Sequence, residues 1–326
     1  MTALLEVRDL TVHYPLPFGI GEIMTRSPRR VVQAVNGVSF GLERGETLGL
    51  VGESGCGKST LGRAILRLTE AKSGEVMFDG TDVLALDRAG LFAFRRRAQM
   101  VFQDPHASLN PRLTVAETLA EVLRVHRVCP RDATQERVAR LLEAVGLSAE
   151  LAARRPAALS GGQCQRVAIA RALAMGPELL ISDESVSALD VSIQAQILNL
   201  FMRLKREMDL TMMFISHDLS VVRHVCHRVA VMYLGRIVEH GPTEQIFRDP
   251  KHPYTQALLR AIPRMDPDAE PPAAAAASEP PSPVALSAGC VFHSRCPQAM
   301  DVCRGPPAPA LRRSDQAEVA CHLYPV

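Results

Sequence analysis

The sequence predicts an α/β fold in which a mainly parallel sheet is covered by helices on both faces. Short apolar runs at residues 47–51, 178–182, 211–216 and 229–233 have the composition of buried strands. Stretches with helical periodicity separate several of these runs, as expected for strands that pair in parallel. A glycine-rich loop follows the first run and leads into residues that can continue as a helix.

Length and composition indicate a globular chain with room for one large domain and an appendage, or for two domains. The chain has 326 residues, of which 47% are hydrophobic and 22% charged, and a net charge of +2. This charge gives no electrostatic argument for a nucleic-acid partner, and the arginines at 95–97 are typical of a solvated helix face. No window approaches 18 consecutive apolar residues, so we expect no membrane span.

The first forty residues predict a β-rich edge. Alternating residues at 4–14 indicate one strand, and residues 35–40 indicate a second, followed by a turn at 43–46. Residues 15–30 are rich in proline, glycine and arginine and are interpreted as a loop or an insertion. Acidic residues near the N-terminus replace the apolar core of a signal peptide, so export by that route is not expected.

A phosphate-binding loop is predicted after the strand at 47–51. Its spacing is G-x-x-x-x-G-K-S, and an ordinary glycine-rich turn is the alternative. Glycines let several backbone N–H groups point inward, and the following helix adds its positive end. Lys58 would reach the terminal phosphates, and the Ser59 hydroxyl would hold Mg²⁺. The predicted nucleotide-binding residues are Gly52, Glu53, Ser54, Gly55, Cys56, Gly57, Lys58, Ser59 and Thr60.

The middle of the chain predicts an inserted helical region between strands. Residues 74–80 and 100–103 are typical of short strands, and residues 113 to about 175 are predicted to be helical. Val138, Leu141, Leu142 and Val145 define one apolar helix face. A further helix is expected from Ser160 toward residue 175.

Two acids end the apolar strand at 178–182. Because ligands bind at the carboxyl ends of parallel strands, Asp183 can hold Mg²⁺ and Glu184 can polarise an attacking water. Two surface acids without a role are the alternative. Upstream, Leu159-Ser160-Gly161-Gly162-Gln163 starts a helix, where a hydroxyl and exposed amides suit a phosphate.

With this pentapeptide the chain resembles the ABC-transporter ATPases over residues 4 to about 250. The order of motifs matches throughout: phosphate loop, Gln103, the signature at 159–163, Asp183-Glu184, the segment 187–190 and His217. The resemblance implies a P-loop NTPase with an ABC-type nucleotide-binding domain, a mainly parallel sheet, an antiparallel β edge and an inserted helical subdomain at about 104–176. It also implies that the chain is an ATPase using ATP and Mg²⁺.

The resemblance further implies that two such domains pair head to tail around ATP. Each nucleotide lies between one phosphate loop and the partner's signature, here Ser160, Gly161, Gly162 and Gln163. Tyr14 corresponds to an aromatic that stacks on adenine, with an ordinary strand residue as the alternative. Gln103 corresponds to a residue that contacts Mg²⁺ and water, Glu184 to the general base, and His217 to a residue that contacts the γ-phosphate. The sequence departs from the usual pattern at three positions, Ser182, Ser185 and Cys164. None of these departures removes a group needed for hydrolysis.

Two segments resemble the oligopeptide/dipeptide permease group, namely residues 103–112 and 252–259. Residues 15–30 and 186–192 resemble the second of the two ATPases in such permeases. The implied function is ATP hydrolysis that drives peptide import at the cytoplasmic face of the inner membrane. Implied partners are two permease subunits, a sister or identical ATPase and, indirectly, a peptide-binding protein. A soluble ABC ATPase acting on nucleic acid or ribosomes is the alternative; such proteins usually carry paired ATPase domains or a long coiled coil.

The C-terminal region is predicted to be a separate part. We expect an ATPase domain at 1–260, a Pro/Ala-rich linker at 261–288 and a C-terminal extension at 289–326 that resembles the one in the same group. This extension holds four of the eight cysteines, and reduced thiols are expected in a chain that is not exported. The hypothesis is that Cys290, Cys296, Cys303 and Cys321 bind a [4Fe–4S] cluster, as in some relatives. Zinc and four unligated thiols are the alternatives.

Overall fold

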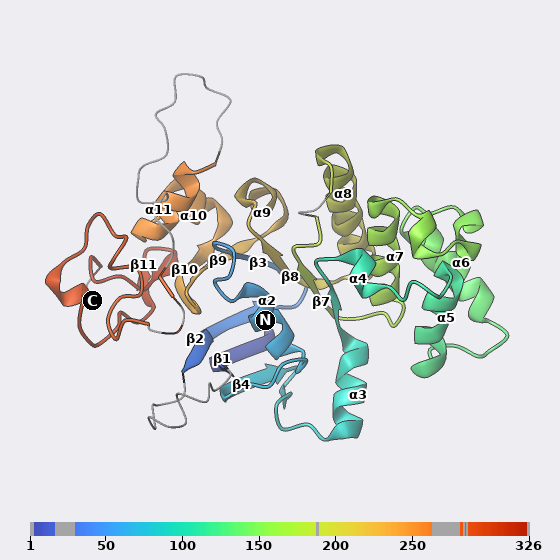
Figure 1. The fold of residues 1–326 in the computed structure, drawn as a ribbon, viewed down its shortest axis with the longest axis horizontal. Coiled ribbons are helices and arrows are strands. Elements are labelled where there is room, and N and C mark those ends of the chain that lie inside the picture. The colour runs from blue at the N-terminus through green and yellow to red at the C-terminus, as the bar shows by residue number, and fades with distance from the viewer. Residues whose placement is uncertain are drawn as a thin grey trace. The chain divides into compact units, whose positions relative to one another are not determined.

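The computed structural model describes residues 3–16, 30–186, 189–262, 281–282, 284 and 286–324. These residues divide into two compact units. The first unit comprises residues up to 4, 42–47 and 85–215, and the second comprises residues 5–41, 48–84 and 216 onward. Figure 1 labels the elements of both units.

Three parallel strands form the sheet of the first unit. β6 (Ala98–Val101) pairs with β7 (Leu179–Asp183), and β7 pairs with β8 (Thr211–Ser216), both in parallel. All residues of β7 and β8 are buried, which explains why both strands are continuous apolar runs in the sequence. The carboxyl ends of β6 and β7 therefore meet at one edge.

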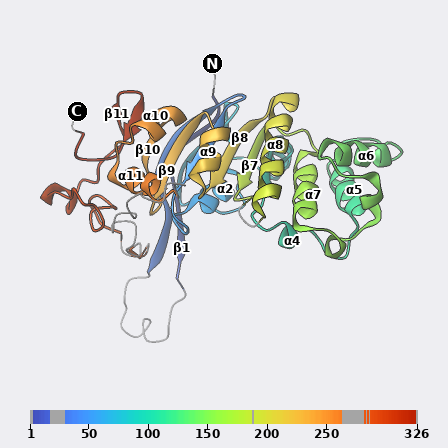
Figure 2. The same cartoon turned by 90° about the horizontal axis from the view of Figure 1, so that it is seen from above.

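The remaining elements of the first unit are helical. The long predicted stretch is interrupted by turns, and the apolar face of Val138, Leu141 and Leu142 is buried as expected. Its helices α5, α6 and α7 pack against one another, in green in Figures 1 and 2. The helices are α3 (Arg88–Arg97), α4 (Pro105–Ser108), α5 (Val115–Val125), α6 (Thr134–Ala144), α7 (Gly161–Leu173) and α8 (Val191–Met208), with 3₁₀ turns at Ala149–Ala153 and Pro156–Ala158.

An antiparallel sheet contributes the β-rich edge of the second unit. Its strand order is β2-β1-β4-β5, with β1 at Ala3–Pro15, β2 at Val31–Glu43, β4 at Ser73–Phe78 and β5 at Thr81–Asp82. Asp79 and Gly80 connect β4 to β5, and both have positive φ angles of 50° and 76°. This conformation suits a two-residue hairpin turn, and Asp-Gly is a preferred pair for it.

A second set of strands in this unit forms both parallel and antiparallel pairs. β3 (Thr47–Val51) is parallel to β9 (Arg228–Tyr233), and β9 is antiparallel to β10 (Arg236–Pro242). β10 was not predicted from the sequence. Two short strands from the C-terminal region continue the sheet: β12 (Ala317–Val319) pairs with β10, and β11 (Arg312–Ser314) pairs with β12.

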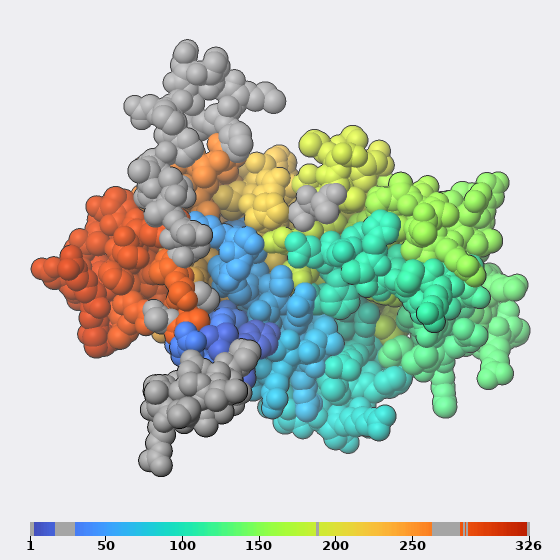
Figure 3. Space-filling model, viewed as in Figure 1, coloured from blue at the N-terminus to red at the C-terminus, as the bar shows by residue number. Residues whose placement is uncertain are grey.

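Among the described residues of the second unit there are four helices, of which α10 (Thr243–Arg248) packs on β9 and β10. They are α2 (Lys58–Ile65), α9 (Leu219–Val225), α10 (Thr243–Arg248) and α11 (Pro253–Arg260), with a 3₁₀ turn at Asp301–Cys303. In Figure 3 the orange-to-red C-terminal residues form a packed body. Within the described ranges, no helix is both long and apolar enough to cross a bilayer.

Two sequence predictions fall largely outside the described ranges. One is the insertion at 15–30, of which residues 17–29 are not described. The other is the linker at 261–288, of which residues 263–280, 283 and 285 are not described. Residues 187 and 188, within the predicted segment 187–190, are not described either.

Candidate nucleotide site

The glycine-rich loop connects β3 to α2 and has a backbone that only glycine can adopt at two positions. Gly52 and Gly57 have φ angles of 154° and 108°. A Cβ atom would lie 2.1 Å from the Met232 carbonyl oxygen at Gly52, and 2.0 Å from the Ala34 carbonyl oxygen at Gly57. Real Cβ atoms do not approach backbone oxygens this closely, so the loop path depends on both glycines.

Lys58 lies at the start of α2 and reaches back over the loop. Its side chain is buried, and Nζ donates hydrogen bonds of 2.9 Å to the carbonyl oxygens of Gly52 and Glu53. α2 has no side-chain N-cap and no acidic residue in its first turn. The positive end of this helix and a lysine ammonium are therefore both associated with the same loop, which suits a polyphosphate.

Gln103 and Glu184 are brought into direct contact in the first unit. Gln103 follows β6 and Glu184 follows β7, and the parallel pairing places both at the same sheet edge. Gln103 Nε2 donates to Glu184 Oε2 at 2.9 Å. Glu184 has a φ angle of 44°, and its N–H donates to the Ile215 carbonyl oxygen at 3.0 Å. The neighbouring Asp183 is fully buried.

The signature residues form the N-terminus of α7. Ser160 is the N-cap: its Oγ accepts from Gln163 N at 3.3 Å, and Gln163 Oε1 accepts from Ser160 N at 3.0 Å. This reciprocal capping box fixes the start of the helix. A Cβ atom at Gly162 would lie 2.6 Å from Ile193 Cγ2, so the glycine allows α7 to approach α8 closely.

Comparisons with known proteins agree with this combination of features. Residues 35–187 match the "ABC transporter" family model, and residues 238–303 match "Oligopeptide/dipeptide transporter, C-terminal region". The chain is 52% identical to the "Probable peptide ABC transporter ATP-binding protein y4tS" of Sinorhizobium fredii, over 98% of this chain and 90% of that protein. It is 47% identical to the "Di/tripeptide transport ATP-binding protein DppF" of Pseudomonas aeruginosa, over 99% and 98% of the two chains. The chain belongs to the ABC transporter ATP-binding proteins.

Solved structures of this family share the fold. A dimeric bacterial ABC transporter cassette, MJ0796, has a TM-score of 0.64 and 29% identity, covering 73% of this chain and 98% of that one. A post-hydrolysis form of the same cassette, bound to ADP and Pi, has a TM-score of 0.63 and 28% identity, covering the same shares. The predicted α/β fold of an ABC ATPase is confirmed, and like other ABC transporter ATP-binding proteins this chain is an ATPase.

Two further predicted site residues of this ABC protein lie in the second unit. His217 is exposed and lies in the turn between β8 and α9, next to the α9 N-cap residue Asp218. Tyr14 lies near the end of β1, and 39% of its surface is exposed. The phosphate loop is in this unit as well, whereas Gln103, Asp183, Glu184 and the signature are in the first unit.

Glu53, the second residue of the phosphate loop, has hydrogen-bond partners that were not predicted from the sequence. Glu53 N donates to Tyr254 Oη at 2.9 Å, and Arg295 donates to both carboxylate oxygens of Glu53. Tyr254 belongs to the segment 252–259 that indicated the peptide-transporter group, but nothing in that pattern pointed to the phosphate loop. Arg295 lies in the cysteine-containing region, where the sequence pattern points only to the thiols.

The predicted cluster at the four C-terminal thiols is not confirmed by the described residues. Cys290 and Cys303 are buried, the N–H of Cys290 donates to the Cys303 carbonyl oxygen at 2.9 Å, and burial raises the pKa of Cys321 to about 11. Among the described residues, no group of three or more His, Cys, Asp or Glu side chains is arranged to hold a metal ion. The [4Fe–4S] hypothesis and its zinc alternative therefore stay predictions.

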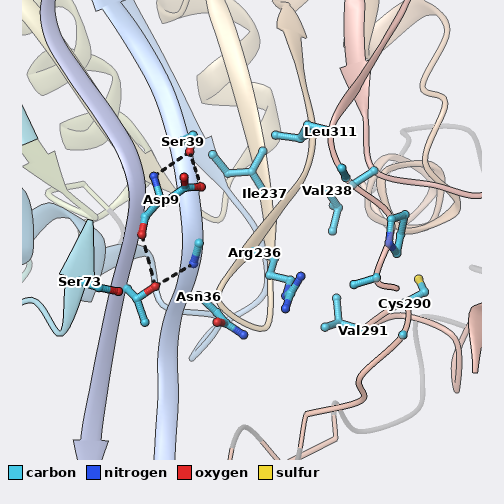
Figure 4. Close-up of a pocket in the computed structure, with 17 residues that line it drawn as sticks. Asp9, Asn36, Ser39, Ser73, Arg236, Ile237, Val238, Cys290, Val291 and Leu311 are labelled. Atoms are coloured by element: carbon cyan, nitrogen blue, oxygen red, sulfur yellow. Dashed lines mark hydrogen bonds between the residues drawn. The ribbon is translucent and has the colours of Figure 1, made fainter. Parts of the chain in front are cut away.

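A cavity of about 540 Å³ lies in the second unit between β1, β2, β10 and the C-terminal residues (Figure 4). On one wall Ser39 Oγ accepts from Asp9 N at 2.8 Å and donates to Asp9 Oδ1 at 3.3 Å. Arg236 and Cys290 line the other side. Desolvation by burial lowers the pKa of Arg236. None of the predicted nucleotide residues lines this cavity.

Proposed function

We propose that this chain is the ATP-hydrolysing subunit of a peptide importer. The observation that carries the proposal is the identity of 47–52% to peptide-transporter ATP-binding proteins over almost the whole chain, including the C-terminal region. Three of these relatives are described by name as acting in peptide, di/tripeptide or oligopeptide transport. This support favours transport over a soluble ATPase acting on nucleic acid or ribosomes.

In the proposed site, the loop from Gly52 to Thr60 holds the phosphates of ATP and Tyr14 stacks on adenine. Lys58 neutralises phosphate charge at the position where it already spans two loop carbonyls. Mg²⁺ would be held by Ser59, Gln103 and Asp183, whose hydroxyl, amide and carboxylate oxygens are the donors that this ion prefers. When bound, the ion supplies charge neutralisation between the phosphates.

Glu184 is the proposed general base for hydrolysis. The hydrogen bond from Gln103 orients the Glu184 carboxylate, which is the group proposed to accept a proton from water. His217 contacts the γ-phosphate. A second ATPase subunit completes each site with its own Ser160-type signature, and the dimeric MJ0796 cassette supports this arrangement.

The proposed assembly has two membrane permease subunits, this chain, a sister or identical ATPase and a peptide-binding protein that delivers the solute. The chain then acts as a peripheral subunit at the cytoplasmic face of the inner membrane. Gln103 and the residues that follow it would transmit the state of the nucleotide to the permease.

An iron–sulfur cluster is a separate proposal. Anaerobic purification with iron and sulfide analysis tests it, and a clean apoprotein with four titratable thiols would contradict it.

The experiment that tests peptide import combines genetics and biochemistry. Deletion of the coding sequence should abolish uptake of labelled di- or oligopeptides, and the wild-type chain should restore it. The Glu184→Gln variant should assemble with the permease but fail to restore uptake. Normal peptide uptake in the deletion strain, with loss of uptake of a different solute, would contradict peptide as the transported class.

A further inference from the structure

The C-terminal region contacts the phosphate loop through a bidentate ion pair. Arg295 Nη1 lies 2.8 Å from Glu53 Oε2, and Arg295 Nη2 lies 2.9 Å from Glu53 Oε1. Only 4% of the Arg295 side chain and 26% of the Glu53 side chain are exposed. A two-point pair between planar groups fixes orientation as well as distance, and its burial reduces screening by solvent.

Aromatic rings hold the Arg295 side chain in place. The guanidinium carbon lies 5.7 Å from the centroid of the Tyr233 ring and 5.9 Å from that of Phe292, within the range of cation–π attraction. Arg295 Nη1 also donates to Tyr233 Oη at 3.3 Å. Tyr233 and Phe292 are almost fully buried, so this support is rigid and the guanidinium presents a fixed pair of donors to the loop.

Glu53 is held at its backbone as well as at its side chain. Its N–H donates to Tyr254 Oη at 2.9 Å, while its carbonyl oxygen accepts from Lys58 Nζ at 2.9 Å and from Cys56 N at 3.3 Å. The carbonyl contact connects Arg295, through Glu53, to the lysine that neutralises phosphate charge. Loss of the ion pair would therefore free the side of the loop that orients Lys58.

We propose that Arg295 is a positioning residue for nucleotide binding, through which the C-terminal region holds the phosphate loop in its binding conformation. The proposal rests on the proposed role of the loop as the ATP site. Arg295 acts through Glu53, since both carboxylate oxygens are paired with its guanidinium. A loop held in advance loses less conformational freedom on binding, so affinity for ATP is the property that this contact raises.

The test measures Mg-ATP affinity and steady-state hydrolysis of the full chain in its transporter complex. Arg295→Met keeps the apolar stem between the rings but removes both hydrogen bonds to Glu53 and the one to Tyr233 Oη. Glu53→Ala removes the carboxylate acceptors. Each should weaken ATP affinity about tenfold, and raise KM with a smaller effect on kcat, because the proposed base is Glu184. The double variant should bind ATP no more weakly than either single variant. Arg295→Lys should recover part of the loss, and Arg304→Met, an exposed control in the same region, should bind like the wild type.

Several outcomes would overturn the positioning role. These are wild-type affinity in Arg295→Met, losses that simply add in the double variant, or a fall in kcat at unchanged KM. Thermal unfolding of each variant shows whether a loss follows from global destabilisation, and Arg295→Lys keeps the test informative if Arg295→Met unfolds. Lys58→Ala separates the two proposals: if it binds ATP like the wild type, the loop is not the ATP site. If only Lys58→Ala loses affinity, the site stands and the positioning role fails.

Discussion

Ser182 Oγ and Ser185 Oγ lie 2.5 Å apart, and both side chains are buried. These are two of the three positions at which the sequence departs from the usual pattern of ABC ATPases. Ser182 places a polar group in the buried strand β7, next to its last residue Asp183. Ser185 supplies the hydrogen-bond partner, one residue after the predicted base. The two departures are therefore one coupled change in structure.

This pair predicts strongly non-additive substitutions. Ser185→Ala leaves a buried hydroxyl without this partner and should lower the free energy of unfolding by about 1–3 kcal/mol. Ser182→Ala should lower the free energy of unfolding by a similar amount. The double variant should lose much less stability than the sum of the two single losses. Urea unfolding of the wild type, the two single variants and the double variant measures the coupling. Additive losses would show that the hydrogen bond contributes nothing to stability.

Glu184→Gln should retain Mg-ATP binding and lose hydrolysis by about 100-fold or more, because an amide cannot accept the proton of the attacking water. The hydrogen bond from Gln103 can persist, since the glutamine side chain keeps an acceptor oxygen. A nucleotide-bound dimer should accumulate, as measured by size-exclusion chromatography with ATP. Glu207→Gln, an exposed change on α8, is the matched control and should hydrolyse normally. Normal turnover in Glu184→Gln would exclude it as the base.

Lys58→Ala should weaken ATP affinity by at least about tenfold. The substitution removes a positive charge from the phosphates and also releases the carbonyl oxygens of Gly52 and Glu53. Equilibrium binding of a fluorescent ATP analogue measures the loss. Lys205→Ala on α8 is the matched control. An unchanged affinity in Lys58→Ala would place the phosphates elsewhere.

His252 predicts a specific loss of stability in acid. Burial lowers its pKa to about 3, and its neutral Nδ1 accepts from Tyr254 N at 3.0 Å. The unfolded chain, with a histidine pKa of about 6.5, binds a proton that the folded chain excludes. The free energy of unfolding should therefore fall as the pH drops from about 6.5 toward 3, by at most about 1.4 kcal/mol per pH unit, and should show no such dependence above this window.

The variant His252→Asn isolates this effect. Asparagine can accept the same hydrogen bond at the N-terminus of α11 but does not titrate. The free energy of unfolding of the variant should therefore depend less on pH between 6.5 and 4. Glu239 accepts from His252 N at 3.0 Å, and burial raises the pKa of this carboxyl, which acts in the opposite direction. Its contribution cancels in the difference between the wild type and His252→Asn. The exposed His224→Asn is the control, and equal pH dependence in all three proteins would contradict the prediction.

The sequence predicted those features that depend on neighbouring residues. The phosphate loop, the apolar strands β7 and β8 and the start of α7 all carry their signals within a few residues. β10 was missed because Glu239 and His240 interrupt its apolar pattern, although both are buried in the structure. Glu239 is accommodated there by hydrogen bonds from the N–H groups of Lys251 and His252, which no local pattern reveals.

The contacts around Glu53 could not be predicted for a different reason. Arg295 is 242 residues away along the chain, and its role depends on a cage formed by Tyr233 and Phe292. The residues of such a contact are ordinary in their own segments. The prediction for the thiols rests on residue type and number alone, and no metal-ion group among the described residues confirms it.

The pairing of β12 with β10 has a consequence for solubility. Glu239 and His240 of β10 are opposite Val319 and Glu318, and the outer strand β11 has only three residues, two of them arginines. A short, positively charged outer strand is a poor template for pairing with another molecule. A chain truncated before residue 286 would expose the backbone N–H and C=O groups of β10, beside the apolar pair Ile237 and Val238. Such chains would associate edge to edge, so the C-terminal residues also protect the protein from aggregation.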